Sequence, residues 1–300
     1  MSRSTHIAIV GAGALGQAVA HVLREKKSVR CSLYDKDATK VPDQGSLHET
    51  VAGAPVVFFC VPSWAVRKAL QEAGEFFADG TLAVVLSKGL EENSSKTMDI
   101  VCDETLPPRV LWALLSGPML ARELSEGLPG GGVVASRSRE ALRILRKVFR
   151  GTPLSLSYSA DAHGVALSGV LKNVYSFGIG IADGIRLGNN AKGVLVSCAL
   201  GEMAALVSKL GGKRSTALGV AGAGDFIATC FSPHSRNRMA GESIGATGTL
   251  SFTSEGSHSL AAFEKLFQQE EVKTPPFFQL ILEVSRGGEA QPLFEDFLAS

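Results

Sequence analysis

The chain has 300 residues, of which 45% are hydrophobic and 20% charged, and its formal net charge is +1 at pH 7. This composition is that of a globular protein and excludes a disordered or fibrous chain. The length exceeds one ordinary core and predicts two domains. The near-neutral charge, with no long run of one sign, excludes a broad electrostatic surface for nucleic acid or an anionic membrane.

The cysteines argue against a disulfide framework or a metal site. There are five of them, scattered and never in a C-x-x-C pair, which fits a reducing compartment. No H-E-x-x-H motif occurs either, so no metal is predicted. A strand begins within a few residues of the N-terminus, which leaves no room for a signal peptide. The longest apolar run, Ala54 to Val61, is too short to span a bilayer, so we expect a cytoplasmic protein.

The first half of the chain alternates short β-rich runs with helical stretches, which is typical of a parallel sheet covered on both faces. The expected strands are His6–Val10, Val29–Tyr34, Pro55–Cys60, Thr81–Leu86, Val110–Leu115, Gly132–Ser136 and Pro153–Ser157. The expected helices between them are Gln17–Lys26, Trp64–Phe76 and Arg139–Phe149.

After about Ser159 the strand-like runs vanish and long stretches with helical spacing replace them. One such stretch carries Leu195, Ala199, Met203, Leu206 and Leu210. We place a domain boundary near Ser157–Asp161. The expected fold is α/β: an N-terminal Rossmann-type doubly wound sheet over residues 1–157, followed by an all-α domain over residues 158–300.

A glycine turn, Gly11–Ala12–Gly13–Ala14–Leu15–Gly16, follows the first strand and precedes a helix. In this context the first glycine makes the turn, the second lets the backbone approach a pyrophosphate, and the third packs helix on strand. The helix start then offers free N–H groups to the anion. The turn predicts a dinucleotide site; the alternative is a tight turn in an unrelated α/β protein.

Asp35 stands 19 residues after Gly16, where such a site needs an acidic residue. Its carboxylate would accept hydrogen bonds from the ribose of NAD and repel the extra phosphate of NADP. Lys36 would partly offset that repulsion. The sequence therefore favours NAD and leaves NADP open.

Lys172 is the one charged residue from Gly164 through Ala182, a helix that is apolar nearly all round and therefore buried. Burial lowers the pKa of a lysine toward neutrality, the range that a general base needs. The alternative is a lysine whose ammonium reaches the surface. Lys88 follows another strand and points a cation to the ligand edge of the sheet, although alone it reads as a solvated loop lysine.

Ser232–Pro233 reads as an N-cap followed by proline at the first helical position, so that Ser235, Arg236 and Asn237 occupy the first turn. Free N–H groups and an arginine there would form a phosphate site; the alternative is an ordinary capped surface helix. Asp225, after a glycine-rich stretch, is either a cap or the partner of a buried lysine.

At these residues the chain resembles the bacterial NAD(P)-dependent glycerol-3-phosphate dehydrogenase family, over nearly its whole length. The matching stretches are Leu86–Ser87–Lys88–Gly89–Leu90–Glu91, Leu115–Ser116–Gly117–Pro118, Glu126–Gly127–Leu128–Pro129, Leu171–Lys172–Asn173–Val174, Ala182–Asp183–Gly184, Gly224–Asp225 and Ser235–Arg236–Asn237–Arg238.

The resemblance implies reversible hydride transfer between sn-glycerol 3-phosphate and NAD(P), which supplies glycerol 3-phosphate for phospholipid synthesis. It also implies that Lys172 is the proton acceptor and donor and that Lys88 contacts both cofactor and substrate. On this hypothesis we expect Lys88 to stabilise charge on the substrate oxygen and Asp225 to hold Lys172 in place. The predicted cofactor-binding residues are Gly11, Gly13, Ala14, Leu15, Gly16, Asp35, Lys36, Lys88, Ala121, Arg236 and Glu255. The predicted substrate-binding residues are Lys88, Gly117, Met119, Lys172, Asn173, Asp225, Ser235, Arg236 and Asn237. The expected partner is a small phosphorylated substrate, and a homodimer is compatible with this reading.

The departures from the family pattern lie mainly on the cofactor side. Ala14–Leu15, Trp64 and Met119–Leu120 replace the usual residues, and the segment from Asp35 to Ala54 is much shorter than the family's. Two other functions stay open: a related β-hydroxyacid or ketopantoate-type reductase, and a module that senses NAD(H) without turnover.

Overall fold

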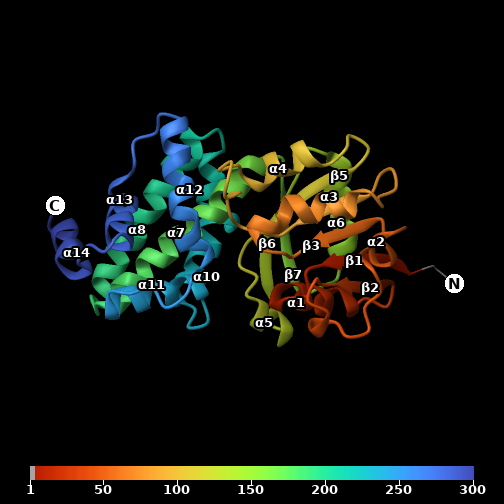
Figure 1. Cartoon of the computed structure of the whole chain (residues 1–300), viewed down its shortest axis with the longest axis horizontal. Helices are drawn as coiled ribbons and strands as arrows, with labels where there is room; N and C mark the ends of the chain where they lie inside the picture. The colour runs from red at the N-terminus through yellow and green to blue at the C-terminus, as the bar shows by residue number, and fades with distance from the viewer. Residues whose placement is uncertain (1–3) are drawn as a thin grey trace. The chain divides into compact units, whose positions relative to one another are not determined.

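The computed structural model describes residues 4–300, which fold into two compact units. Of the described residues, the first unit contains 4–87 and Thr97–Ala162, and the second contains Lys88–Lys96 and His163–Ser300. Over the described residues, the first unit combines a sheet with helices and the second is helical (Figure 1). The expected α/β class with a helical second part is confirmed.

The first unit is built on a seven-stranded sheet, counted over residues 4–300, in the order β2-β1-β3-β4-β5-β6-β7. Its strands are β1 (Thr5–Val10), β2 (Val29–Tyr34), β3 (Val56–Phe59), β4 (Leu82–Val85), β5 (Leu111–Ser116), β6 (Gly130–Ala135) and β7 (Leu154–Ser159). Each overlaps an expected strand. β3 and β4 are buried at every position because helices cover both faces of the sheet.

The sheet is mostly parallel, as expected; the exception is β6, which runs antiparallel to β5. The chain leaves β5 and enters β6 at the same edge through the short helix α5 (Ala121–Ser125), so it makes no crossover. Gly117 has φ 143°, and a Cβ there would lie 2.5 Å from the Cα of Gly132. Only glycine allows this close return.

Helices α1 (Ala14–Arg24) and α6 (Arg139–Phe149) share one hydrophobic core with the strands. The remaining helical elements of this unit are η1 (Ala38–Lys40), α2 (Leu47–Val51), η2 (Ser63–Ala65), α3 (Val66–Gly74) and α4 (Met98–Thr105). The stretch expected as one helix, Trp64–Phe76, is thus a 3-10 turn followed by a shorter helix. The short segment between Asp35 and Ala54 holds only η1 and α2.

The helices of the second unit are α7 (Ala162–Gly184), α8 (Gly188–Lys209), α9 (Arg214–Ala217), the π-helical turn η3 (Val220–Gly224), α10 (Asp225–Phe231), α11 (Arg236–Thr247), α12 (Glu255–Gln269), α13 (Pro276–Ser285) and α14 (Ala290–Ala299). α7 approaches α11 closely: a Cβ at Gly180 would lie 2.0 Å from the Arg238 carbonyl oxygen, and one at Gly241 would lie 1.9 Å from that of Phe177.

By length and composition alone, α7 and α8 could each cross a membrane. The most apolar window of α7 is 100% buried inside the protein and that of α8 is 33% buried. A core helix of a globular domain passes the same test, so neither helix is a clear membrane span.

Candidate active site

The glycine turn connects β1 to α1, and its geometry explains each glycine. Gly11 has φ 97°, and a Cβ there would lie 2.7 Å from the carbonyl carbon of Cys60. A Cβ at Gly16 would lie 1.9 Å from the Gly11 oxygen, so helix and turn touch backbone to backbone. At Gly13 no described atom lies within 4 Å of the Cβ position, which leaves room for a ligand beside the backbone.

The start of α1 is suited to a pyrophosphate. Gly13 is the N-cap residue, no side chain caps the helix, and its first turn carries no acidic residue. The amides of this turn therefore present their partial positive charge to the open space. Ala14 is exposed there, whereas Leu15 packs partly against the core. These residues fit a dinucleotide.

Asp35 directly follows β2 and is held in one position. Its Oδ2 accepts a hydrogen bond from the Ala12 amide at 2.8 Å, and its Oδ1 accepts one from the Asp37 amide at 3.0 Å. Partial burial tends to raise the pKa of Asp35, but these amides and Lys40 outweigh it and hold the pKa below its usual value. The carboxylate is therefore ionised and correctly placed beside the glycine turn.

Two neighbours of Asp35 were missed by sequence reasoning. Gln44 brackets the Asp35 backbone with two hydrogen bonds of 2.7 Å, and Lys40 Nζ lies 3.2 Å from Asp35 Oδ1. Lys36, expected to offset the Asp35 charge, instead pairs with Glu72 at 3.0 Å. No sequence period indicates these contacts, because they depend on how the short segment after Asp35 folds back.

Lys172 lies in the middle of α7 and is 6% exposed. Its Nζ donates to Thr229 Oγ1 at 2.9 Å and lies 3.3 Å from Asp225 Oδ1. Burial lowers the pKa of Lys172 to about 8; Asp225 opposes this shift and Lys88 adds to it. A buried lysine with this pKa can accept and return a proton near neutral pH.

Asp225 bridges two lysines in the second unit. Its Oδ2 lies 2.7 Å from Lys88 Nζ, while its other oxygen faces Lys172. Asp225 is 2% exposed, so the three charges share a site with little water. The positive charge of Lys88 beside Lys172 favours the neutral form of Lys172.

Thr229 is a further member of this cluster that sequence reasoning missed. It stands one helical turn after Asp225 on α10, so both side chains point the same way. Its buried hydroxyl lies 3.5 Å from Asp225 Oδ1 and accepts the hydrogen bond from Lys172. The i, i+4 spacing from Asp225 was the signal that could have indicated it.

Asn173 and Asn237 form a chain of hydrogen bonds through the same unit. Asn173 Nδ2 donates to the Lys88 carbonyl at 2.9 Å, and Asn237 Nδ2 donates to Asn173 Oδ1 at 2.8 Å. The Gly256 amide donates to Asn237 Oδ1 at 2.9 Å. These amides tie the Lys88 loop, α7, α11 and the start of α12 together, so each keeps only part of its capacity for a ligand.

The predicted helix start near Arg236 occurs, but its cap differs from the prediction. Ser232 ends α10, and the N-cap of α11 is Ser235, whose Oγ accepts from the Arg238 amide at 3.3 Å. Pro233 therefore lies in the preceding turn rather than at the first helical position. Arg236 opens the helix with its guanidinium 5.4 Å from the Phe252 ring centroid.

Arg238 anchors this helix start to α7. Its guanidinium binds Asp183 at 2.5 Å and Glu242 at 3.2 Å, while Lys192 of α8 also reaches Asp183 at 2.8 Å. Asp183, in the predicted Ala182–Asp183–Gly184 motif, thus holds the segment that carries Ser235, Arg236 and Asn237.

The other predicted site residues lie as follows. In the first unit, Met119 is 6% exposed in the hydrophobic core and Ala121 begins α5. Gly117 makes the close return described above. In the second unit, Glu255 begins α12 after the N-cap Ser254. Within residues 4–300, no group of three or more His, Cys, Asp or Glu side chains is arranged to hold a metal ion.

Comparison with known proteins connects both units to one family. The family model for the N-terminus of NAD-dependent glycerol-3-phosphate dehydrogenase matches residues 37–142, and the model for its C-terminus matches residues 161–292. These ranges include Lys88 and the whole cluster around Lys172.

Individual relatives agree. The glycerol-3-phosphate dehydrogenase [NAD(P)+] of Fusobacterium nucleatum is 33% identical over 81% of this chain and 79% of its own. That of Azotobacter vinelandii is 32% identical over 90% of this chain and 87% of its own. The crystal structure of glycerol-3-phosphate dehydrogenase from Coxiella burnetii covers 99% of both chains with a TM-score of 0.91 at 27% identity. The chain therefore belongs to the NAD-dependent glycerol-3-phosphate dehydrogenase family, whose members are NAD(P)-dependent oxidoreductases.

Proposed function

We propose that this protein catalyses the reversible oxidation of sn-glycerol 3-phosphate to dihydroxyacetone phosphate with NAD(P). The observation that carries the proposal is the buried cluster of Lys172, Asp225 and Lys88, in which one carboxylate bridges two lysines. The names of the relatives support the same substrate. NAD(P), when bound, supplies the hydride acceptor or donor.

Lys172 accepts or donates the proton that is transferred in the reaction. In oxidation its neutral Nζ takes the proton of the substrate hydroxyl, and in reduction its ammonium returns a proton to the carbonyl oxygen. With a pKa of about 8, roughly a tenth of Lys172 is neutral at pH 7. Both protonation states are therefore available near neutral pH.

Asp225, Thr229 and Lys88 set up that proton transfer. Asp225 and Thr229 orient the Lys172 ammonium through contacts of 3.3 and 2.9 Å. Lys88, fixed at 2.7 Å from Asp225, adds positive charge that stabilises a developing alkoxide. In this poorly hydrated site such fixed charges act more strongly than in water.

The start of α11 is the proposed site for the substrate phosphate. Arg236 provides a guanidinium that can bind two phosphate oxygens, and the amides of the first turn add their partial positive charge. Ser235 caps this turn, and Asn237 connects it to Asn173 beside Lys172. The substrate carbon skeleton would then extend from Arg236 toward the lysines.

For the cofactor, we propose a preference for NAD over NADP. The ionised Asp35 carboxylate, beside the glycine turn, would accept hydrogen bonds from the ribose hydroxyls of NAD and repel the additional phosphate of NADP. Lys36 does little to offset this charge, because Glu72 neutralises it. Lys40 is the neighbouring cation that would soften the preference.

In the cell, we propose a cytoplasmic enzyme that supplies glycerol 3-phosphate for phospholipid synthesis. The proposed oligomeric state is a homodimer, which light scattering on the purified protein would test. A mass equal to one chain at micromolar concentration would refute it.

The activity is tested by following the oxidation of NADH and NADPH on addition of dihydroxyacetone phosphate. We expect turnover with both and a higher kcat/KM with NADH. Lys172→Ala should lower kcat by about 100-fold or more, because general acid–base catalysis contributes that much. Lys209→Ala, a change of an exposed lysine at the end of α8, is the matched control and should leave kcat unchanged.

Absence of turnover with both cofactors would contradict the proposal. If NADH then still raised the melting temperature, the chain would be a cofactor-binding module without this activity. Near-normal turnover by Lys172→Ala would instead show that another group carries the proton.

A further inference from the structure

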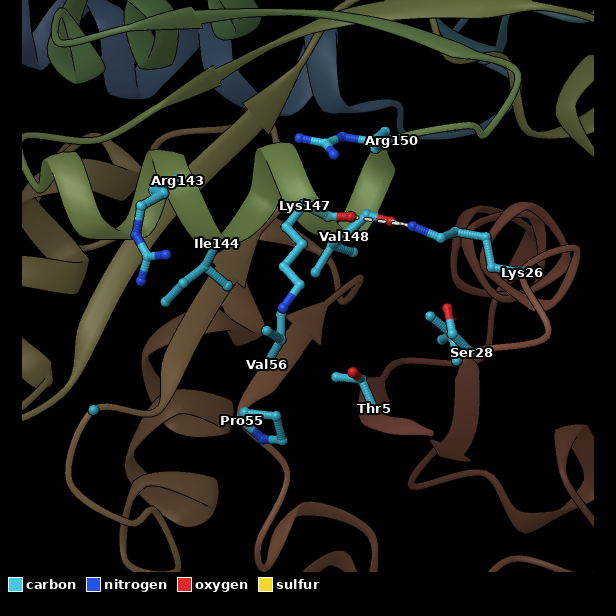
Figure 2. Close-up of a pocket in the computed structure, with 12 residues that line it drawn as sticks. Thr5, Lys26, Ser28, Pro55, Val56, Arg143, Ile144, Lys147, Val148 and Arg150 are labelled. Atoms are coloured by element: carbon cyan, nitrogen blue, oxygen red, sulfur yellow. Dashed lines mark hydrogen bonds between the residues drawn. The ribbon is translucent and has the colours of Figure 1, made fainter. Parts of the chain in front are cut away.

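A hollow of about 440 Å³ lies at the amino-terminal edge of the sheet in the first unit. It opens beside Thr5 at the start of β1, Ser28 before β2 and Val56 at the start of β3, and one wall is the last part of α6. Figure 2 shows Lys147 extending from α6 toward Val56 inside this hollow.

The hollow is separate from the dinucleotide site. The glycine turn adjoins the beginning of α1, whereas Lys26, just past the end of α1, lines the hollow. The helix has 11 residues, which at 1.5 Å per residue places its two ends about 16 Å apart. Nothing in the proposed reaction uses this edge of the sheet.

Among residues 4–300, four cationic side chains line the hollow and no acidic residue does. Lys26 Nζ donates to the carbonyl oxygens of Lys147 and Val148 at 3.1 and 2.8 Å, as the dashed lines in Figure 2 mark. Arg143 pairs with Glu140 at 2.5 Å. Over residues 4–300 the structure gives neither Lys147 nor Arg150 an acidic partner.

Cations near the carboxyl end of a helix also compensate its macrodipole. The hollow is therefore a candidate anion site only if its positive charge exceeds what the helix ends and nearby carboxylates neutralise. The carboxyl end of a helix carries about half a negative charge, and the carboxyl ends of both α1 and α6 lie here. Together with Glu140 they offset about two of the four cations, which leaves an excess of about two positive charges. Burial and the charge of Arg150 lower the pKa of Lys26, as expected where positive charge accumulates.

We propose that this hollow is a binding site for a small organic phosphate. Two uncompensated cations match a dianion, and the Thr5 and Ser28 hydroxyls can donate to phosphate oxygens. The aliphatic side chains of Val56 and Ile144 offer contact to a compact carbon body. The volume suits a molecule of metabolite size rather than a polymer.

The test is calorimetric titration of the full-length Arg236→Gln variant with n-butyl phosphate, inorganic phosphate and n-butanol. Arg236→Gln disables the proposed substrate phosphate site, so that binding elsewhere can be measured. We expect one site for butyl phosphate, weaker binding of inorganic phosphate, and none of butanol. Adding the Lys147→Gln and Arg150→Gln substitutions should weaken the binding of butyl phosphate about tenfold or more, since two charge-assisted contacts are lost.

The matched control replaces two exposed cations outside the hollow, Arg139→Gln and Lys209→Gln, and should alter affinity less than about twofold. No binding of butyl phosphate, or equal weakening by both pairs of substitutions, would overturn the proposal.

This outcome is distinguishable from failure of the proposed function. With Arg236 intact, the Lys147→Gln, Arg150→Gln protein should keep its dehydrogenase kcat and KM at low ionic strength. A protein without dehydrogenase activity could still bind butyl phosphate in the hollow, and an active enzyme could fail to do so.

Discussion

Replacing Lys172 by Met is expected to stabilise the folded protein while abolishing its proposed activity. The folded state lowers the pKa of Lys172 from 10.5 to about 8, chiefly through burial. Below pH 8 the lysine is protonated in both states, and the folded protein carries the full penalty for its ammonium. Between pH 8 and 10.5 the unfolded state binds more protons than the folded state, so this lysine's contribution to stability becomes less unfavourable as pH rises.

The size of the effect follows from the shift. At about 1.4 kcal/mol per pKa unit, the penalty is on the order of 3 kcal/mol at pH 7 and about 1 kcal/mol at pH 9.5. Methionine has a similar length and no charge, and Asp225 keeps its contact of 2.7 Å with Lys88. The loss of the hydrogen bond to Thr229 removes about 1 kcal/mol of the gain.

The assay is urea unfolding of both proteins at pH 7 and pH 9.5, which gives the difference in the free energy of unfolding at each pH. The advantage of Lys172→Met should fall by about 2 kcal/mol between the two. Comparing variant with wild type cancels the titration of groups that do not interact with Lys172. Lys209→Met, at an exposed site, is the control and should show no such change. A difference independent of pH, or a strongly destabilised Met variant, would refute the reasoning.

Three further predictions concern the site and its support. The rate of oxidation should rise with pH through about 8 and the rate of reduction should fall there, and Lys88→Met should move both limbs to higher pH because Lys88 helps to lower the pKa of Lys172. Asp35→Ser should shift the ratio of kcat/KM values toward NADPH by about tenfold or more, since it removes the charge that opposes the additional phosphate. Glu202→Ala should destabilise the protein by about 3 kcal/mol in urea unfolding, because this carboxylate accepts bonds of 2.7–3.0 Å from the Tyr175 hydroxyl and from the first two amides of α13.

An unmoved pH limb in Lys88→Met would mean that Lys172 is not the group that titrates in the rate. An unchanged cofactor ratio in Asp35→Ser, with an intact melting curve, would remove Asp35 from cofactor selection. For Glu202→Ala the control is Glu295→Ala on the exposed face of α14, which should change stability by less than about 0.5 kcal/mol.

Local patterns in the chain predicted much of the first unit. The strands could be predicted because short runs of β-branched and aromatic residues bounded by turn residues are typical of strands in a globular chain. The antiparallel direction of β6 could not be predicted, because the side-chain pattern of a strand buried on both faces is the same in either direction. The direction depends on whether the preceding connection crosses the sheet, and here it is decided by the close return at Gly117 and Gly132.

In the candidate site, too, the sequence predicted some residues and not the contacts between them. A lone charge on an apolar helix indicated Lys172, since burying an ammonium without purpose is too unfavourable to be common. The sequence could not show that Thr229 would bond to it or that Lys88 and Lys172 would share one carboxylate. It also misplaced the cap of α11, where Ser235 and Ser232 are chemically equal candidates and only the backbone path distinguishes them.

By itself, then, the sequence determined the glycine turn, the strand and helix types and the presence of a costly buried lysine, because these depend on neighbours a few residues away. Tertiary structure alone decided that the segment Lys88–Lys96, which follows a strand of the sheet, belongs to the helical unit. It also decided that Asp225 lies 2.7 Å from a lysine 137 residues earlier in the chain. Such contacts follow from the packing of whole helices, and the free energy that selects them is spread over the buried surfaces of many residues.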